Sequence, residues 1–283
     1  MANVVLKSVC RAMERIAPLR LAESWDNVGL LLESPVQRSA TKRILLTIDL
    51  TTSVLSEAIA KEASVIVSYH PPIFKGLQSL TLANSLQASL LRCAAQGISI
   101  YSPHTALDCV SGGVNDWLAE GVLGGGKDGA IQSLVGEKVS PTGASEGGEG
   151  RLVTLNTPIG LGVLESRIKT HLKLSQIQVG YAESHLSPIR TIAICAGSGG
   201  AMLSGKQADV YFTGEMSHHE VLAAVAAGKH VILCGHTNTE RGYLPVLAAK
   251  LRHELQRDEY RDHGAEDLEV IVSQNDQHPL QFV

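Results

Sequence analysis

Histidines and carboxylates that follow apolar runs are the residues of this sequence that could do chemistry. His70 follows the run SVIVSY, and His104 and Asp108 follow the run ISIYS. His236 and Glu240 follow a third run, KHVILC. Imidazole nitrogens combined with carboxylates suit zinc, iron or manganese, whereas ligand sets made only of oxygen suit magnesium or calcium. If these three places converge in the fold, they form a site for one or two divalent metal ions.

The spacing within two of these groups favours a shared ion. His104 and Asp108 are four residues apart, and so are His236 and Glu240. Residues four apart lie on the same face of a helix, so both members of a pair can reach one ion. Carboxylates can also bridge two cations, and a bound metal lowers the pKa of coordinated water, which supplies a nucleophile for hydrolysis.

Other residues near these motifs have structural interpretations that we favour. Asp49 ends the run RILLTID, and we expect it to cap the next helix, with an orienting role beside the site as the alternative. His219 begins a predicted helix and is expected to be structural or on the surface, unless it faces the pocket. Cys234 ends an apolar strand and is expected to be a small buried hydrophobe instead of a nucleophile. The glycines at 197–200 predict a tight turn, with an anion-binding loop as the weaker alternative.

Alternating strands and helices must position these residues. Near-continuous apolar strands separated by helices indicate parallel sheets with helices on both faces, and ligands bind outside the carboxyl ends of such strands. The expected strands are 43–49, 64–69, 98–102, 152–156, 177–181, 190–195, 209–213, 229–234 and 268–273. The expected helices are 4–17, 51–63, 82–96, 158–171, 217–227 and 239–255. We therefore predict an α/β protein of two lobes with mostly parallel sheets.

A change in composition divides the predicted lobes. The segment 124–150 contains GGG and PTGASEGGEG, so we expect it to be a flexible Gly-rich loop or linker. The first lobe is then 1–123 and the second 151–283, with the second contributing His236 and Glu240 to the shared site.

Composition and charge exclude several classes of protein. The chain has 283 residues, 44% hydrophobic residues and a net charge of −4, which excludes a disordered chain and gives no general case for nucleic-acid binding. Its five scattered cysteines favour reduced thiols over a disulfide framework. No apolar run is long enough to cross a membrane, and no secretory signal is evident. We expect a cytoplasmic protein, with the nucleus as a further possibility and the mitochondrion less favoured.

Five ordered motifs resemble the Nif-three-like proteins, a family that also carries the label of type two GTP cyclohydrolase homologue. The resemblance covers nearly the whole chain. The motifs are SWDNVGLL at 24–31, SYHPPIF at 68–74, SPHTALD at 102–108, TGEMSHHE at 213–220 and GHTNTERGYL at 235–244.

The resemblance implies a dinuclear metal site between two α/β lobes, and homo-oligomers that are often hexameric rings. The residues matching the family's metal ligands are His70, Asp108, His236 and Glu240, with His104 beside them. Asp108 and Glu240 are the candidates for bridging carboxylates. Asp26 and Asn27 match a pattern near the site that is expected to orient a ligand or a loop.

One departure from the family pattern concerns the second metal. Bacterial members usually carry two adjacent histidines where this chain has Tyr69 and His70. A phenol is a poor ligand at neutral pH because its ordinary pKa is near 10. One of the two metal positions is therefore expected to be weaker, different in metal preference or empty.

Two functions from different classes fit these observations. The first is a metal-dependent hydrolase of a small anionic or nucleotide-like substrate, in which Glu240 or Asp108 moves a proton. The second is a metal-stabilised interaction protein of the transcriptional co-regulator type, which binds metal and protein partners without turnover. The cyclohydrolase label does not decide between them, because no motif identifies GTP.

Overall fold

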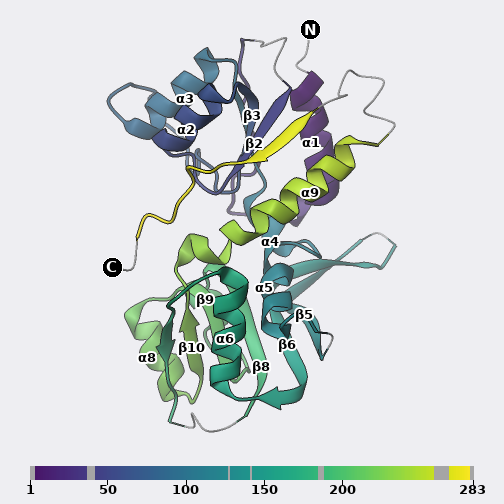
Figure 1. Cartoon of the computed structure of the whole chain (residues 1–283), viewed down its shortest axis with the longest axis vertical. Helices are drawn as coiled ribbons and strands as arrows, with labels where there is room; N and C mark the ends of the chain where they lie inside the picture. The colour runs from purple at the N-terminus through teal and green to yellow at the C-terminus, as the bar shows by residue number, and fades with distance from the viewer. Residues whose placement is uncertain are drawn as a thin grey trace. The chain divides into compact units, whose positions relative to one another are not determined.

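The chain folds into two compact units of the α/β class. A computed structural model describes residues 4–36, 42–126, 128–140, 142–183, 188–257 and 268–280. The first unit combines 1–107 with 243–277, and the second combines 108–242 with 278–283. Figure 1 shows the elements of each unit, coloured by residue number from purple at the N-terminus to yellow at the C-terminus.

The units differ from the predicted lobes in two respects. The boundary falls between Leu107 and Asp108, inside the short helix α4 (His104–Cys109), and not after residue 123. The segment 243–277, predicted to belong to the second lobe, belongs to the first unit. The reason is strand pairing, since β11 (Glu269–Val272) pairs in parallel with β2 (Arg43–Thr47). Local sequence patterns do not reveal a pairing between segments so far apart in the chain.

The first unit contains a five-stranded sheet of order β1-β4-β3-β2-β11. Its strand β1 (Gly29–Leu32), which the sequence did not predict, runs antiparallel to β4 (Ser99–Ser102). The other pairings are parallel, as predicted, and β3 (Ala63–Ser68) is the central strand. The helices are α1 (Val4–Ile16), α2 (Thr52–Ala60), α3 (Ser85–Ala95) and α9 (Leu244–Leu255), with a short 3-10 turn at Leu19–Leu21.

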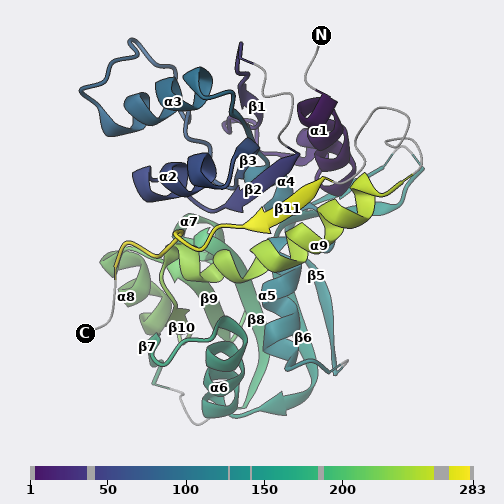
Figure 2. The same ribbon diagram turned by 45° about the horizontal axis from the view of Figure 1, so that its top comes forward.

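Helices cover both faces of this sheet, as Figure 2 shows. On one face, Leu45, Ile66 and Ile100 pack against apolar residues of α2 and α3. Their neighbours along the strands, such as Leu46 and Val65, are also fully buried, and α1 and α9 contact the sheet. Burial on both faces explains why these strands read as continuous apolar runs.

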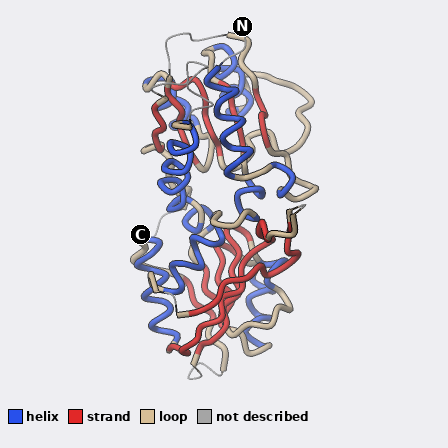
Figure 3. The backbone as a smooth tube through the Cα atoms, turned by 90° about the vertical axis from the view of Figure 1, so that its right-hand side faces the viewer, coloured by secondary structure: helices blue, strands red, loops and turns tan. Residues whose placement is uncertain are grey.

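The second unit contains a six-stranded mixed sheet of order β5-β6-β8-β9-β10-β7. The strands β8 (Ile189–Ser198), β9 (Val210–Glu215) and β10 (His230–Leu233) are parallel. The strands β5 (Gly129–Val139), β6 (Ser145–Ile159) and β7 (Gln178–Gly180) pair antiparallel. Figure 3 shows the strands with helices beside them. The helices are α5 (Val114–Leu123), α6 (Leu161–Leu172), α7 (Gly200–Leu203) and α8 (His218–Ala226), with 3-10 turns at His236–Thr239 (η2) and Arg241–Tyr243 (η3).

The prediction of a Gly-rich loop over 124–150 is wrong. Most of that segment belongs to an antiparallel hairpin of β5 (Gly129–Val139) and β6 (Ser145–Ile159). At Gly147 other backbone comes close: a Cβ on this residue, which has a φ of +127°, would lie 1.9 Å from the carbonyl oxygen of Cys109. Glycine in a strand therefore marks a close approach here, which composition alone reads as a linker.

No helix among the described residues reaches the length and apolar character that a membrane span requires.

Candidate metal centre

The first unit orients His70 with a carboxylate from the neighbouring strand. His70 follows β3 and Asp49 follows β2, and these strands are parallel neighbours. Nδ1 of His70 lies 2.9 Å from Oδ1 of Asp49. A ring that donates its Nδ1 proton to a carboxylate keeps the lone pair on Nε2, which is then the atom that can bind a metal.

Asp49 does not cap the next helix, which was the role favoured from the sequence. Thr51 is the cap of α2, and its hydroxyl accepts the amide of Val54 at 3.2 Å. Because Thr51 already supplies this cap, Asp49 takes the alternative role of orienting a site histidine.

His104 has the same arrangement with Asp26. Nδ1 of His104 lies 2.8 Å from Oδ1 of Asp26, which precedes β1, the antiparallel neighbour of β4. The amide and hydroxyl of Thr105 also donate to this carboxylate. Burial alone would raise the pKa of Asp26, but the hydrogen bonds from His104 and Thr105 more than offset it, so the pKa lies below its ordinary value. Asp26 is thus an ionised carboxylate that fixes the ring of His104.

Tyr69 and Asn27 have supporting contacts in the first unit. The buried ring of Tyr69 lies with its centroid 5.0 Å from that of His70 and 5.5 Å from that of His104. Its main-chain oxygen accepts the hydroxyl of Ser102 and the amide of His104. The side-chain amide of Asn27 donates to the carbonyl of Ile73. Tyr69 therefore packs against both imidazoles, and Asn27 ties two loops together.

The second unit brings His236 and Glu240 together. Nε2 of His236 lies 3.3 Å from Oε1 of Glu240, across one 3-10 turn. Nδ1 of His236 lies 3.0 Å from Oε2 of Glu215, which ends β9, the parallel neighbour of β10. Only 2% of the Glu240 side chain is exposed. The predicted four-residue pairing is thus present, although the turn is a 3-10 helix.

A tight glycine turn leaves room for this pair. Gly197 has a φ of +63°, and a Cβ there would lie 2.7 Å from Oε1 of Glu240 and 2.9 Å from Nε2 of His236. The amide of Gly197 donates to the hydroxyl of Thr239, and the amide of Gly199 donates to the hydroxyl of Thr213. These amides are used within the protein, which supports the predicted turn over an anion-binding loop.

Asp108 begins the second unit on α4, where its main-chain oxygen accepts the side-chain amide of Asn115 at 3.2 Å. Burial raises the pKa of the Cys195 thiol strongly, and the negative charges of Asp108 and Glu240 raise it further. Both carboxylates therefore act on the same buried thiol.

The two remaining candidates from the sequence lie outside the histidine–carboxylate pairs. His219 is exposed on the first turn of α8, with its ring 5.4 Å from that of His218. Cys234 is buried, and burial raises the pKa of its thiol to about 12, which removes its nucleophilic form at neutral pH.

Glu215 is the functional candidate that sequence reasoning missed. It lies in the motif TGEMSHHE, of which the sequence alone singles out only His219 as a candidate. The signal was available, because Glu215 ends a parallel strand, the same position that singled out His70 and Asp49.

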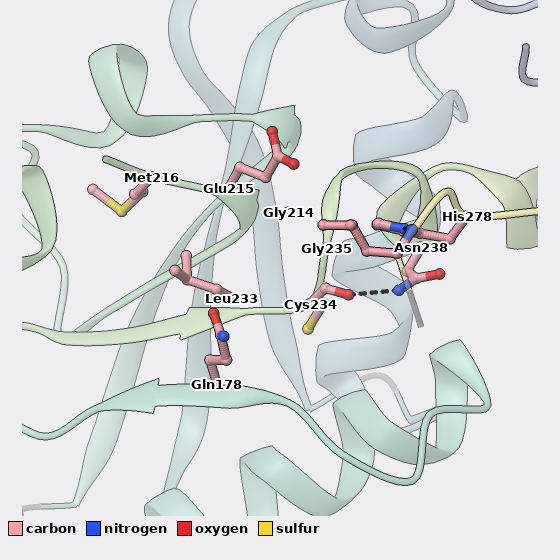
Figure 4. Close-up of a pocket in the computed structure, with 10 residues that line it drawn as sticks. Gln178, Gly214, Glu215, Met216, Leu233, Cys234, Gly235, Asn238 and His278 are labelled. Atoms are coloured by element: carbon pink, nitrogen blue, oxygen red, sulfur yellow. Dashed lines mark hydrogen bonds between the residues drawn. The ribbon is translucent and has the colours of Figure 1, made fainter. Parts of the chain in front are cut away.

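A cavity of about 210 Å³ lies beside Glu215 in the second unit, at the carboxyl ends of β9 and β10 (Figure 4). The side-chain amide of Asn238 donates to the carbonyl of Cys234 at its edge. The lining of the cavity is mixed, with apolar side chains beside amide, carboxylate and imidazole groups. The lining residues are Gln178, Gly214, Glu215, Met216, Leu233, Cys234, Gly235, Asn238, His278 and Leu280.

Comparisons with known proteins agree on the family. A family model described as Duf34/NIF3 (NGG1p interacting factor 3) matches residues 4–279. The chain is 47% identical to the protein NIF3 homolog of Schizosaccharomyces pombe, covering 99% of this chain and 98% of the relative. It is 37% identical to the NGG1-interacting factor 3 of Saccharomyces cerevisiae, covering 97% and 96%. A solved hypothetical protein of Staphylococcus aureus matches with a TM-score of 0.79 and 25% identity, covering 99% of this chain and 100% of that one. The chain belongs to the Duf34/NIF3 family.

Proposed function

We propose that the protein is a divalent-metal-dependent hydrolase. In this proposal His70, His104, Asp108, His236 and Glu240 hold one or two divalent ions, as the family resemblance implies. The observation that carries the proposal is the repeated pairing of a histidine Nδ1 with a carboxylate, at His70 with Asp49, His104 with Asp26 and His236 with Glu215.

The donor set fits a transition metal. Metal-ligating histidines characteristically donate their other ring nitrogen to a carboxylate, which fixes the tautomer and the ring orientation. Each pair arises within one unit, at the ends of adjacent strands. Imidazoles with carboxylates favour zinc, iron or manganese. The packing of Tyr69 against the two imidazoles is consistent with a second position that binds metal more weakly.

A bound divalent ion would lower the pKa of coordinated water and polarise the bond to be broken. The residues of the chain would orient the substrate and exchange protons with it. Glu240 is the better candidate for the proton shuttle because its carboxylate is buried beside Nε2 of His236, and Asp108 is the other. The proposed substrate is small and anionic or nucleotide-like. A hexameric assembly is proposed from the family resemblance, and a cytoplasmic location from the composition of the sequence.

Elemental analysis of the metal-replete protein tests the proposal. We expect one or two ions per chain, with loss of metal in folded His236→Ala and His70→Ala variants. His219→Ala, which changes an exposed histidine outside the ligand set, should keep the native content. A screen of nucleotides, including GTP, and of phosphoesters should then find turnover that stops when a chelator removes the metal. Absence of metal in the native protein would refute the proposal.

A metal-stabilised interaction protein is the second candidate. The relative in Saccharomyces cerevisiae is named for its interaction with NGG1, which favours protein partners in transcription regulation. In that case the protein would bind metal without turnover, and folded ligand variants would bind the partner as well as the native protein does. Partner binding measured on the same variants separates the two functions.

A further inference from the structure

Three aromatic rings form what we call the aromatic corner of the first unit: Trp25, Phe74 and His104. The centroid of Trp25 lies 6.0 Å from that of Phe74 and 6.2 Å from that of His104. The ring centroids of Phe74 and His104 lie 6.4 Å apart. Tryptophan and phenylalanine are scarce in the chain, with two and three residues, yet one of each lies beside a candidate ligand histidine.

The large rings of the corner are open to solvent. Trp25 is 61% exposed and Phe74 is 45% exposed, whereas the other tryptophan, Trp117, is buried. The three rings meet edge to face, at interplanar angles of 64°, 78° and 81°. Edge-to-face contacts leave part of each ring face uncovered, and that is the surface on which a planar ring stacks.

The residues that follow Trp25 hold the corner in place. Asp26, whose side chain is fully buried, orients the ring of His104. Asn27 donates to the carbonyl of Ile73, the residue before Phe74. The loops that carry the two exposed rings are therefore fixed to each other and to His104, so the corner needs little ordering when a ligand binds.

We infer that the aromatic corner binds the planar heteroaromatic ring of a small ligand, as a nucleobase would present it, and holds that ring beside His104. The inference rests on the proposed hydrolase only for the identity of the ligand as substrate. Stacking of the ring on Trp25 requires no metal. Removal of a stacking side chain typically weakens binding of a base by about 5- to 150-fold.

Tryptophan fluorescence tests the inference directly. The variant Trp117→Phe leaves Trp25 as the sole tryptophan of the chain. We expect AMP to quench its emission to saturation, in both metal-free and metal-replete protein. Ribose 5-phosphate, which has the sugar and phosphate without the ring, should leave the emission unchanged. Equal responses to AMP and ribose 5-phosphate would overturn the inference.

Calorimetry in the wild-type background gives a second test that does not depend on the folding of Trp117→Phe. Trp25→Leu should weaken AMP binding by about 5- to 150-fold, while Trp25→Phe should restore most of it. Leu82→Ala changes another exposed apolar side chain of the same unit, which is 75% exposed, and should have no effect. Unchanged AMP affinity in Trp25→Leu would overturn the inference.

The measurements separate this inference from the proposed function. Metal in the protein without a ring-specific response would refute the aromatic corner and leave the metal centre standing. A ring-specific response in protein that never binds metal would support the corner and refute the hydrolase. If Trp25→Leu changes the sedimentation coefficient and leaves AMP binding intact, the corner is a contact between subunits and the inference is wrong.

Discussion

Nδ1 of His70 and Oδ1 of Asp49 lie 2.9 Å apart, at the carboxyl ends of two neighbouring parallel strands. The pair makes a specific prediction for Asp49→Asn. Loss of the negative charge weakens the hold on the ring and lowers the basicity of Nε2, so metal affinity should fall by about 10- to 100-fold. Competition with a chromogenic chelator measures it. Glu33→Gln removes an exposed carboxylate of the same unit and should leave affinity unchanged; an equal loss in both variants would contradict the orienting role.

Gly197→Ala should impair the metal centre through crowding. A Cβ there would lie 2.7 Å from Oε1 of Glu240, so the carboxylate must move. Gly205→Ala is a matched control, because Gly205 also has a positive φ, +77°, yet its Cβ would meet nothing within 4 Å. Both variants should lose about 1 kcal/mol of stability from the left-handed backbone. Metal affinity measured beside thermal unfolding should fall only in Gly197→Ala, and loss in Gly205→Ala as well would point to a general effect of strain.

Glu57 should make stability depend on pH. Its carboxylate accepts the hydroxyl of Ser273 at 2.6 Å and the amides of Gln274 and Asn275. Burial would raise the pKa of Glu57, but these hydrogen bonds outweigh it and the pKa falls below the ordinary 4.5. The charged form therefore stabilises the fold above pH 4.5, and this stabilisation is lost as the pH falls through the lowered pKa.

Glu57→Gln tests that dependence. Urea unfolding well above pH 4.5 should show a loss of about 1 to 3 kcal/mol in the variant, because it leaves buried donors poorly satisfied. The difference from the native protein should shrink in acid, where Glu57 is itself protonated. A difference that stays constant across the pH range would show that charge is not involved.

The thiols should react slowly in the native protein. Burial raises the pKa of Cys93 and of Cys234 to about 12, and that of the half-buried Cys10 to about 11. Thiolates are the reactive form, so little of each is available at neutral pH. Reaction with Ellman's reagent should be slow before denaturation and should give five thiols afterwards. Cys10→Ser should remove the fastest native phase, and a native thiol that reacts as fast as free cysteine would contradict the burial argument.

The sequence predicts which residues follow strands because the rule behind this prediction is local. His70 and His236 each follow a short apolar run, and a parallel sheet brings the carboxyl ends of its strands to one edge. The neighbour of each strand cannot be read in the same way, and so neither can the carboxylate that pairs with each histidine. Asp26 and His104 are 78 residues apart, and their contact depends on the antiparallel pairing of β1 with β4.

The Gly-rich hairpin shows a different limit of sequence reasoning. Glycine is depleted in ordinary strands, so a segment rich in it favours a loop. At Gly147 of β6 a side chain is excluded because the backbone at Cys109 passes too close for a Cβ. Only the fold reveals that neighbour.

The return of β11 to the first sheet has a consequence for synthesis of the chain. On the ribosome, β2, β3 and β4 emerge early, whereas β11 follows the whole of 108–242. Until it arrives, β2 is an open strand edge that can pair with other chains. The protein therefore has a period of vulnerability to aggregation whose length is set by the translation time of the second unit, and a holdase chaperone would be most useful during it.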